Sequence, residues 1–142
     1  MAKGDLHSDV ERIIARLRFG QPDDQVILFI PSHDKSDPPK RLTDQDIWAS
    51  QGLDLFGQLY GGATALRAVQ GVWKEETDGH GRLLYDSPIM IQSLAQRADV
   101  EDQRKLRLLL DFAKRMGQAT NQACVAISIN DVIHFISDYN RG

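Results

Sequence analysis

Two polar segments, far apart in the sequence, carry residue types suited to binding or acting on a small molecule. One follows an apolar run at residues 26–30, and the other follows a segment with helical periodicity. The candidate ligand-binding residues in them are His33, Asp34, Lys35, Thr120, Asn121 and Gln122. Because histidine titrates near neutral pH, His33 is also the candidate acid or base.

Other kinds of chemistry have weaker support. A metal site would need His33, His80 and Asp34 to converge without a spacing motif, so we expect no metal and no cofactor. The single cysteine, Cys124, excludes an intrachain disulfide and is expected to be a small buried hydrophobe. Trp73 is either core, the favoured interpretation, or the stacking wall of a pocket.

The pair Gly61–Gly62 raises the question of a phosphate-binding loop. Such loops place backbone N–H groups at a helix N-terminus against the anion. Here the glycines follow a periodic helical segment, where carbonyl groups are presented instead. Gly61 is therefore predicted to be the left-handed residue that ends a helix.

Length and composition limit the function classes. The chain has 142 residues, enough for one domain, and a net charge of −3. A negative net charge gives no overall electrostatic attraction to the phosphates of nucleic acid. An RNA-binding sheet, a third possibility, is further weakened by the lack of paired aromatic residues on a central strand. The sequence contains no long apolar run and no stretch resembling a signal peptide, so we expect a cytoplasmic protein that does not cross a membrane.

The first part of the chain predicts a helical arm and a buried strand. Residues 8–19 fit a helix with Ser8 as its N-cap and Gly20 at its end, packed on the domain or on a partner chain. Residues 1–20 would form the arm, and residues 21–142 a single domain. The run 26–30 is expected to be a central strand buried on both faces.

The remaining elements follow from periodicity and turn residues. Thr43 is expected to cap a second helix that ends at Gly61, and Asp99 a third that ends at Gly117. The second helix is expected to turn an apolar stripe toward the core, formed by Trp48, Gly52, Leu55, Phe56 and Leu59. A long hairpin is expected between them, with a break at Pro88 because proline cannot donate to a ladder. The predicted strands are 64–74, 83–94, 123–129 and 132–136, and the last two are joined by a turn at 130–131.

This order predicts an α+β fold. The middle elements spell β-α-β-β-α-β, the ferredoxin-like arrangement, with an additional N-terminal helix and a short C-terminal strand. Two helices would cover one face of an antiparallel sheet. The N-terminal helix or a second copy of the chain would cover the other face, so we expect a homodimer or a higher homo-oligomer.

The predicted fold brings the candidate residues together. The segment 33–35, the hairpin turn with His80 and the segment 120–122 should meet at one edge of the sheet. The second helix begins there, preceded by Lys40 and Arg41. Such an edge suits an anionic small molecule, although loops are also polar simply because they are hydrated.

The hairpin residues Gly71–Lys74 and Gly81–Asp86, with Arg115–Gly117 and Thr120–Gln122, resemble small bacterial proteins of unknown function. In those proteins a ferredoxin-like fold carries a Gly-x-Trp strand, and a Gly-containing turn leads to a strand with an acidic residue. The resemblance covers residues 26–136 and implies the fold, without assigning any catalytic residue.

The leading hypothesis is an oligomeric, cytoplasmic binding module of bacterial or phage origin, for an anionic small molecule or a protein partner. It depends on the lack of a motif that combines a nucleophile, a base and an electrophile. The rival hypothesis is a small enzyme with His33 as acid or base and Asn121 or Gln122 orienting the substrate.

Overall fold

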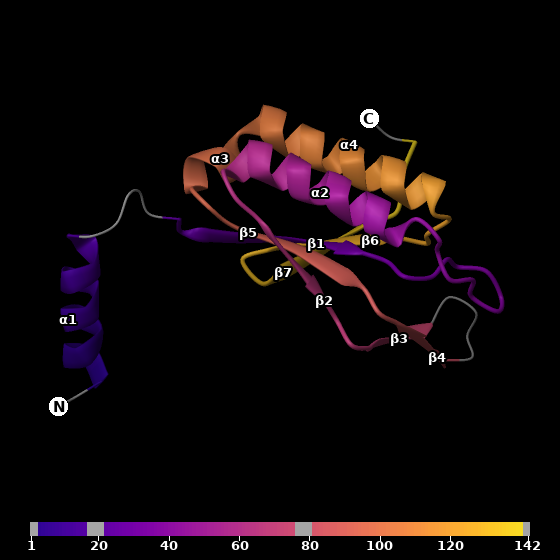
Figure 1. Ribbon diagram of the computed structural model, residues 1–142, viewed down its shortest axis with the longest axis horizontal. Helices are drawn as coiled ribbons and strands as arrows, with labels where there is room; N and C mark the ends of the chain where they lie inside the picture. Colours follow the sequence, from indigo (N-terminus) through magenta and orange to yellow (C-terminus); the bar gives the residue numbers. More distant parts are fainter. Residues whose placement is uncertain (1–2, 17–21, 76–80, 141–142) are drawn as a thin grey trace.

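The computed structural model describes residues 3–16, 22–75 and 81–140 as a mixed α+β protein (Figure 1). Two helices lie on the same side of a five-stranded antiparallel sheet, and a two-stranded ribbon extends from that sheet. The elements are α1 (Lys3–Ala15), β1 (Asp24–Ile30), α2 (Gln45–Tyr60), β2 (Thr64–Arg67), β3 (Gly71–Glu75), β4 (Arg82–Asp86), β5 (Ile89–Ala95), α3 (Arg97–Glu101), α4 (Gln103–Ala119), β6 (Val125–Ile129) and β7 (Val132–Ile136). None of the described helices is long and apolar enough to cross a membrane.

The five strands lie in the order β2-β5-β1-β6-β7, and every pair is antiparallel. The expectation that β1 is buried on both faces is wrong. Val26, Leu28 and Ile30 point under the helices and are fully buried, whereas Ile27 and Phe29 on the opposite face are only half-buried. The β-branched and aromatic residues of this strand suit a pleated surface, but tertiary packing covers only one side of it.

The core fills the space between the sheet and helices α2 and α4. Phe56 of α2 and Leu109 and Met116 of α4 are fully buried against Leu28 and Ile91 of the sheet. Each such side chain contributes about 1.5–3 kcal/mol by leaving water. The predicted stripe of α2 is thus confirmed as core, and its Trp48 contacts Phe112 of α4 edge-on, with 5.7 Å between ring centroids.

The helix boundaries were predicted less well than the helices themselves. Gly61 is confirmed as the left-handed C-cap of α2, with φ of 88°. Asp44, rather than Thr43, occupies the N-cap of α2, and α1 begins at residue 3, so Ser8 lies inside the helix. The part of the predicted first helix at residues 17–19 lies outside the described residues.

The third predicted helix is divided. A short helix, α3, occupies residues 97–101, and Asp102 then caps α4 by accepting hydrogen bonds from the N–H groups of Arg104 and Lys105. The expectation that Asp99 caps this helix is therefore wrong, and so is its end at Gly117, because α4 continues to Ala119. Acidic residues at 99 and 102 both fit an N-terminal signal, and the backbone kink at Asp102 decides between them.

The predicted hairpin is present, and both of its strands are divided. The break at Pro88 was expected, whereas the break at residues 68–70, which divides the predicted strand 64–74 into β2 and β3, was not. Pro88 lies between β4 and β5, and β2 pairs with β5 while β3 pairs with β4 as a separate ribbon. The turn from β6 to β7 is also confirmed, with both Asn130 and Asp131 in the left-handed region. Cys124 is exposed, contrary to expectation, because it precedes β6 rather than lying within it.

Candidate functional site

The segment after β1 forms a compact loop that begins the site. Asp34 shapes it by accepting hydrogen bonds from the backbone N–H groups of Ser36 and Lys40, at 3.0 and 2.8 Å, and from the Ser36 hydroxyl. These bonds, first of all the one from Lys40, lower the pKa of Asp34. Because they favour the ionised form, the carboxylate acts as a local clamp for residues 33–41.

The structure brings the two predicted polar segments together. The backbone N–H of Lys35 donates to the carbonyl of Asn121 at 3.0 Å, and the Gln122 amide donates to the carbonyl of His33 at 2.8 Å. Tyr139 supports this contact by donating to the carbonyl of Gln122 at 3.0 Å. The convergence predicted from the element order is therefore confirmed.

Several of the predicted ligand-binding residues are occupied with the protein itself. The Thr120 hydroxyl is buried and donates to the carbonyl of Met116, and the Gln122 amide also contacts the carbonyl of Thr120. Together with Asp34, these residues hold the loops in place. The side chains of Lys35 and Asn121 are exposed, and their contact with a ligand stays a prediction.

His33 is held by a buried hydroxyl. Ser32 Oγ lies 2.7 Å from His33 Nδ1, and it accepts a hydrogen bond of 2.8 Å from the backbone N–H of Ser87. Ser32 is fully buried, so its own hydroxyl proton needs an acceptor, and among the described contacts His33 Nδ1 is the one placed to accept it. The neutral imidazole therefore carries its proton on Nε2 and presents a donor to its surroundings.

Asp86, at the end of β4, comes near this imidazole because the next residue, Ser87, donates its backbone N–H to Ser32, the chain neighbour of His33. The indole N–H of Trp73 donates to Asp86 Oδ1 at 3.2 Å across the β3–β4 pair. Burial raises the pKa of Asp86, while the Trp73 hydrogen bond and, when it is protonated, the charge of His33 act in the opposite direction. Ser32, His33, Trp73 and Asp86 are called the His33 cluster below.

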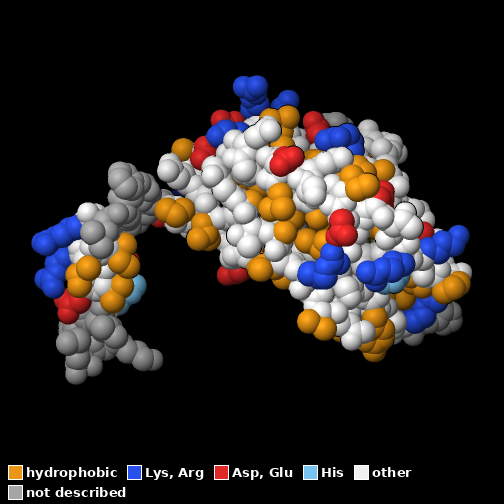
Figure 2. Space-filling view, in the orientation of Figure 1, with side chains coloured by type: hydrophobic (Ala, Val, Ile, Leu, Met, Phe, Trp, Pro, Cys, Tyr) orange, Lys and Arg blue, Asp and Glu red, His pale blue; other side chains and the backbone are white. Residues whose placement is uncertain are grey.

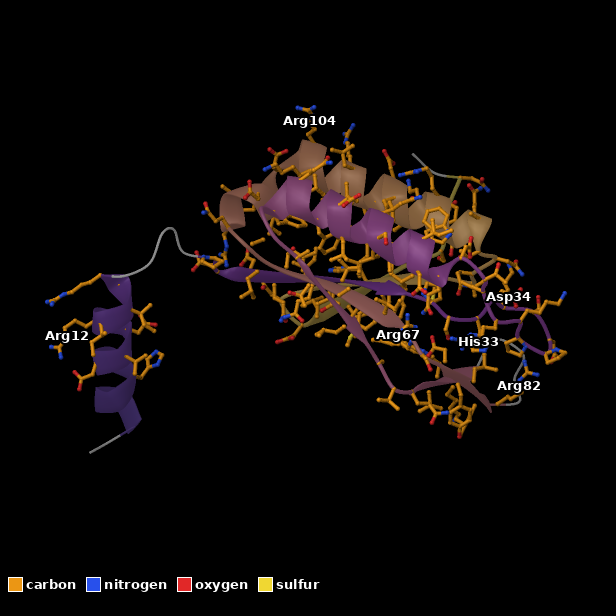
Figure 3. All side chains as sticks on the ribbon, in the orientation of Figure 1. Arg12, His33, Asp34, Arg67, Arg82 and Arg104 are labelled. Atoms are coloured by element: carbon orange, nitrogen blue, oxygen red, sulfur yellow. The ribbon has the colours of Figure 1, made fainter. Side chains whose placement is uncertain are left out.

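The ribbon face that carries Asp86 is tied to the loop. Arg82 and Asp37 form an ion pair of 2.8 Å, so β4 is connected to the loop at a second point (Figure 3). A Cβ on Gly71 would lie 3.0 Å from Asp86 Oδ1, which explains the small residue opposite this carboxyl. His80, expected at the same edge, lies outside the described residues.

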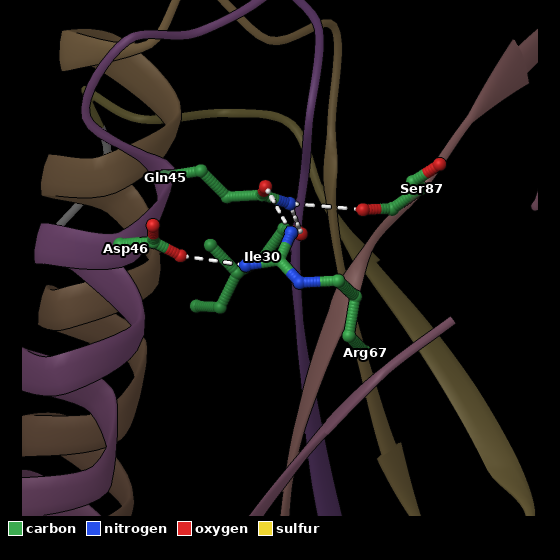
Figure 4. Close-up of polar contacts among 5 residues, drawn as sticks. All are labelled: Ile30, Gln45, Asp46, Arg67 and Ser87. Atoms are coloured by element: carbon green, nitrogen blue, oxygen red, sulfur yellow. Dashed lines mark hydrogen bonds and ion pairs between the residues drawn. The ribbon is translucent and has the colours of Figure 1, made fainter. Parts of the chain in front are cut away.

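A polar network fixes the base of the ribbon to helix α2 (Figure 4). The buried side chain of Gln45 donates to the carbonyl of Ser87 at 3.0 Å and accepts from Arg67 at 3.0 Å. Arg67 also pairs with Asp46 at 2.7 Å. Since Ser87 contacts Ser32 through its N–H, this network and the His33 cluster share one strand junction.

Sequence reasoning missed Ser32 and Asp86 of the cluster, and it favoured a core position for Trp73. Trp73 is 43% exposed, so its assignment to the core is wrong, and a ribbon that projects from the sheet explains why. Asp86 was visible only as an acidic residue in a strand, with nothing to indicate its neighbours. The one available signal for Ser32 was its position next to a histidine.

Other parts of the described structure are weaker candidates for a functional site. A hollow of about 330 Å³ on α4, lined by Gln103, Arg104, Arg107 and Leu108, lies on the other side of the molecule from His33 (Figure 3). His134 is exposed on edge strand β7. Among the described residues, no group of three or more His, Cys, Asp or Glu side chains is arranged to hold a metal ion.

Two solved structures resemble this chain. A phage SAM lyase in complex with S-methyl-5′-thioadenosine has a TM-score of 0.54 and 16% identity, covering 88% of this chain and 97% of its own. A phage SAM lyase in the apo state has a TM-score of 0.52 and 14% identity, covering 84% and 92%. No protein-family model and no curated protein matches the sequence. At these identities the likeness shows a shared fold.

Proposed function

We propose that this chain binds a small molecule at the His33 cluster, and that the ligand is an adenosine with a sulfur-linked side chain. One observation carries the proposal: the hydrogen bond between Ser87 and Ser32 brings the His33 segment to the end of β4, where Asp86 accepts a hydrogen bond from the indole of Trp73 on β3. A few convergent polar groups beside an aromatic surface are typical of small-molecule sites.

The chemistry of the cluster suits this ligand class. The half-exposed indole of Trp73 offers a surface on which an adenine ring can stack. When it is ionised, Asp86 can accept hydrogen bonds from ribose hydroxyl groups and attract the positive charge of a sulfonium group. The Nε2–H of His33 can donate to the carboxylate of an amino-acid side chain. The likeness to a SAM lyase that holds S-methyl-5′-thioadenosine supports this choice over other nucleosides.

A second candidate function is cleavage of S-adenosylmethionine. Release of S-methyl-5′-thioadenosine would break the bond between sulfur and the amino-acid carbon, with the electron pair moving to sulfur and neutralising its charge. In an elimination, the adjacent carbon then loses a proton to a base. The Ser32 hydrogen bond occupies the lone pair of neutral His33, so Asp86, with its raised pKa, is the better base in this geometry.

Calorimetry and chromatography separate the two functions. We expect S-adenosylmethionine or S-methyl-5′-thioadenosine to bind the intact chain, with affinity reduced about tenfold or more by Asp86→Asn or Trp73→Leu. Asp54→Asn, on the exposed side of α2, is the matched control. Formation of S-methyl-5′-thioadenosine that disappears in Asp86→Asn would favour the lyase. Binding of neither compound, or binding unchanged in both cluster variants, would refute the proposal.

The architecture and setting of the protein are part of this proposal. The order β2-β5-β1-β6, with α2 and α4 as the crossing helices, supports a ferredoxin-like fold to which β7 and α1 are added. A single cysteine supports a reducing compartment and hence the cytoplasm. The relation to small bacterial proteins with a Gly-x-Trp strand remains a prediction.

A further inference from the structure

We propose that the sheet face opposite α2 and α4 is an interface with a second copy of this chain, and that α1 of that copy packs on it. This face is called the open sheet face. It includes Ile27, Phe29, Leu66, Leu94, Ile133 and Phe135, which the cross-strand pairing places on one side. The inference does not depend on the ligand assigned to the His33 cluster.

The open sheet face is uncharged and mostly apolar; its polar residues are Gln25, Thr64, Gln92 and Ser128. Leu66 and Leu94 are 45% and 62% exposed near one edge, and Ile133 and Phe135 are 49% and 55% exposed at the other. Among the described strand residues that face this way, none is Asp, Glu, Lys or Arg, although these types make up 26% of the sequence. A large exposed face without charge is typical of an interaction surface.

Helix α1 carries a second uncovered apolar surface. Val10, Ile13 and Ile14 are 44–58% exposed, and α1 stands apart from the sheet (Figure 1). Hydrophobic side chains gather on one side of α1 and arginines on the other (Figure 2). A helix of 13 residues is only marginally stable in water, so its apolar side needs a partner surface.

The width of the sheet explains why the partner is a second copy. β2 and β7 are four strand spacings apart, which is about 19 Å at roughly 4.8 Å each. A helix is about 10 Å across, so the chain's own α1 would leave one exposed edge uncovered. A larger body is needed to cover Leu66 and Phe135 together.

The available area leads to the same occupant. Five strands of 4–7 residues give the open sheet face a footprint of about 450 Å², and one side of α1 adds about 200 Å². A standard interface buries about 800 Å² on each partner. The sheet face alone falls short of this value, and the sheet face with α1 approaches it.

Light scattering on the full chain tests the interface. We expect an oligomer at micromolar concentration that dissociates in Ile13→Glu on α1 and in Leu94→Glu on the sheet. Leu108→Glu is the matched control, because Leu108 is 44% exposed on α4, away from both surfaces. Circular dichroism confirms that each variant is folded. A monomeric wild-type chain, or an oligomer that either variant leaves intact, would overturn the proposal.

Cross-linking distinguishes the chain's own α1 from that of a second copy. In a Cys124→Ser background, one chain carries Ile13→Cys, and its partner carries Leu94→Cys or Ile133→Cys at opposite edges of the face. A bismaleimide should join the mixed chains into a species of twice the mass in at least one pair. A second protein carries both cysteines on one chain. If it gives only intramolecular products and the mixed chains are not joined, α1 folds onto its own sheet and the proposal is refuted.

Discussion

Three glycines inside helices give a sharp test of the packing. A Cβ on Gly117 of α4 would lie 2.5 Å from the ring of Tyr139, which no real contact permits. A Cβ on Gly57 of α2 would meet nothing within 4 Å, and one on Gly52 would lie 3.2 Å from Ile91 Cγ1. The same substitution to alanine should therefore have opposite effects at Gly57 and Gly117.

The magnitudes follow from opposing terms. Replacing glycine by alanine inside a helix stabilises by about 1 kcal/mol, so Gly57→Ala should raise stability by that amount. Gly117→Ala has the same gain, but it displaces Tyr139. The hydrogen bond to Gln122 is lost at a cost of about 1 kcal/mol, and so is the packing of a half-buried ring, worth about 1 kcal/mol more. We expect a net loss of about 1 kcal/mol.

Urea unfolding of a double-mutant cycle measures this clash. In a Tyr139→Ala background the clash is absent, so Gly117→Ala should stabilise by about 1 kcal/mol, giving a coupling energy of about 2 kcal/mol. Each single change corresponds to a shift in Tm of roughly 3–5 °C for a chain of this size. Equal effects of Gly117→Ala in both backgrounds would show that Tyr139 does not lie against α4 as the structure has it.

Three further predictions concern the polar contacts. Hydrogen bonds from Arg97 and Asn130 lower the pKa of the buried Asp24. The ionised carboxylate therefore stabilises the fold at pH values above the pKa of an unfolded aspartate, and this stabilisation is lost as the pH falls through the lowered pKa of the folded state. Asp24→Asn should therefore be less stable than wild type at pH 7, with the difference narrowing below pH 4 in urea titrations; a constant difference would contradict this. Gln45→Ala removes three hydrogen bonds and should cost about 2–3 kcal/mol by thermal unfolding, and a loss below 0.5 kcal/mol would show that the network of Figure 4 is not formed. Nitrogen-15 NMR of His33 should show the Nε2–H tautomer in wild type and a mixture in Ser32→Ala, whereas an Nδ1–H signal in wild type would refute the assigned hydrogen bond.

Much of the fold was predictable because local chemistry and the final packing agree. The stripe of α2, the left-handed Gly61, the break at Pro88 and the turn at Asn130–Asp131 all depend on neighbours within a few residues. Boundaries failed where two nearby residues had similar signals. Asp99 and Asp102 both suit an N-cap, and only the bend of the chain between α3 and α4 selects Asp102.

The candidate site was predictable only in outline. The order of elements was enough to bring His33 and Gln122 together, because strand and helix ends meet at one edge of such a sheet. It did not show that Gln122 and Asp34 are occupied by backbone groups, or that Asp86 comes near His33 and accepts a hydrogen bond from Trp73. Those contacts depend on how far the ribbon bends away from the sheet.

The sequence by itself therefore determined the approximate positions and order of most helices and strands, and the meeting of the two polar segments. Periodicity and turn residues act over a few positions, and they leave few ways to arrange the elements. Only the tertiary structure decided which groups in the His33 cluster are free to meet a ligand and which face of the sheet stays open. Burial and hydrogen-bond partners are set by contacts between residues such as Ser32 and Ser87, 55 positions apart, and no local pattern records them.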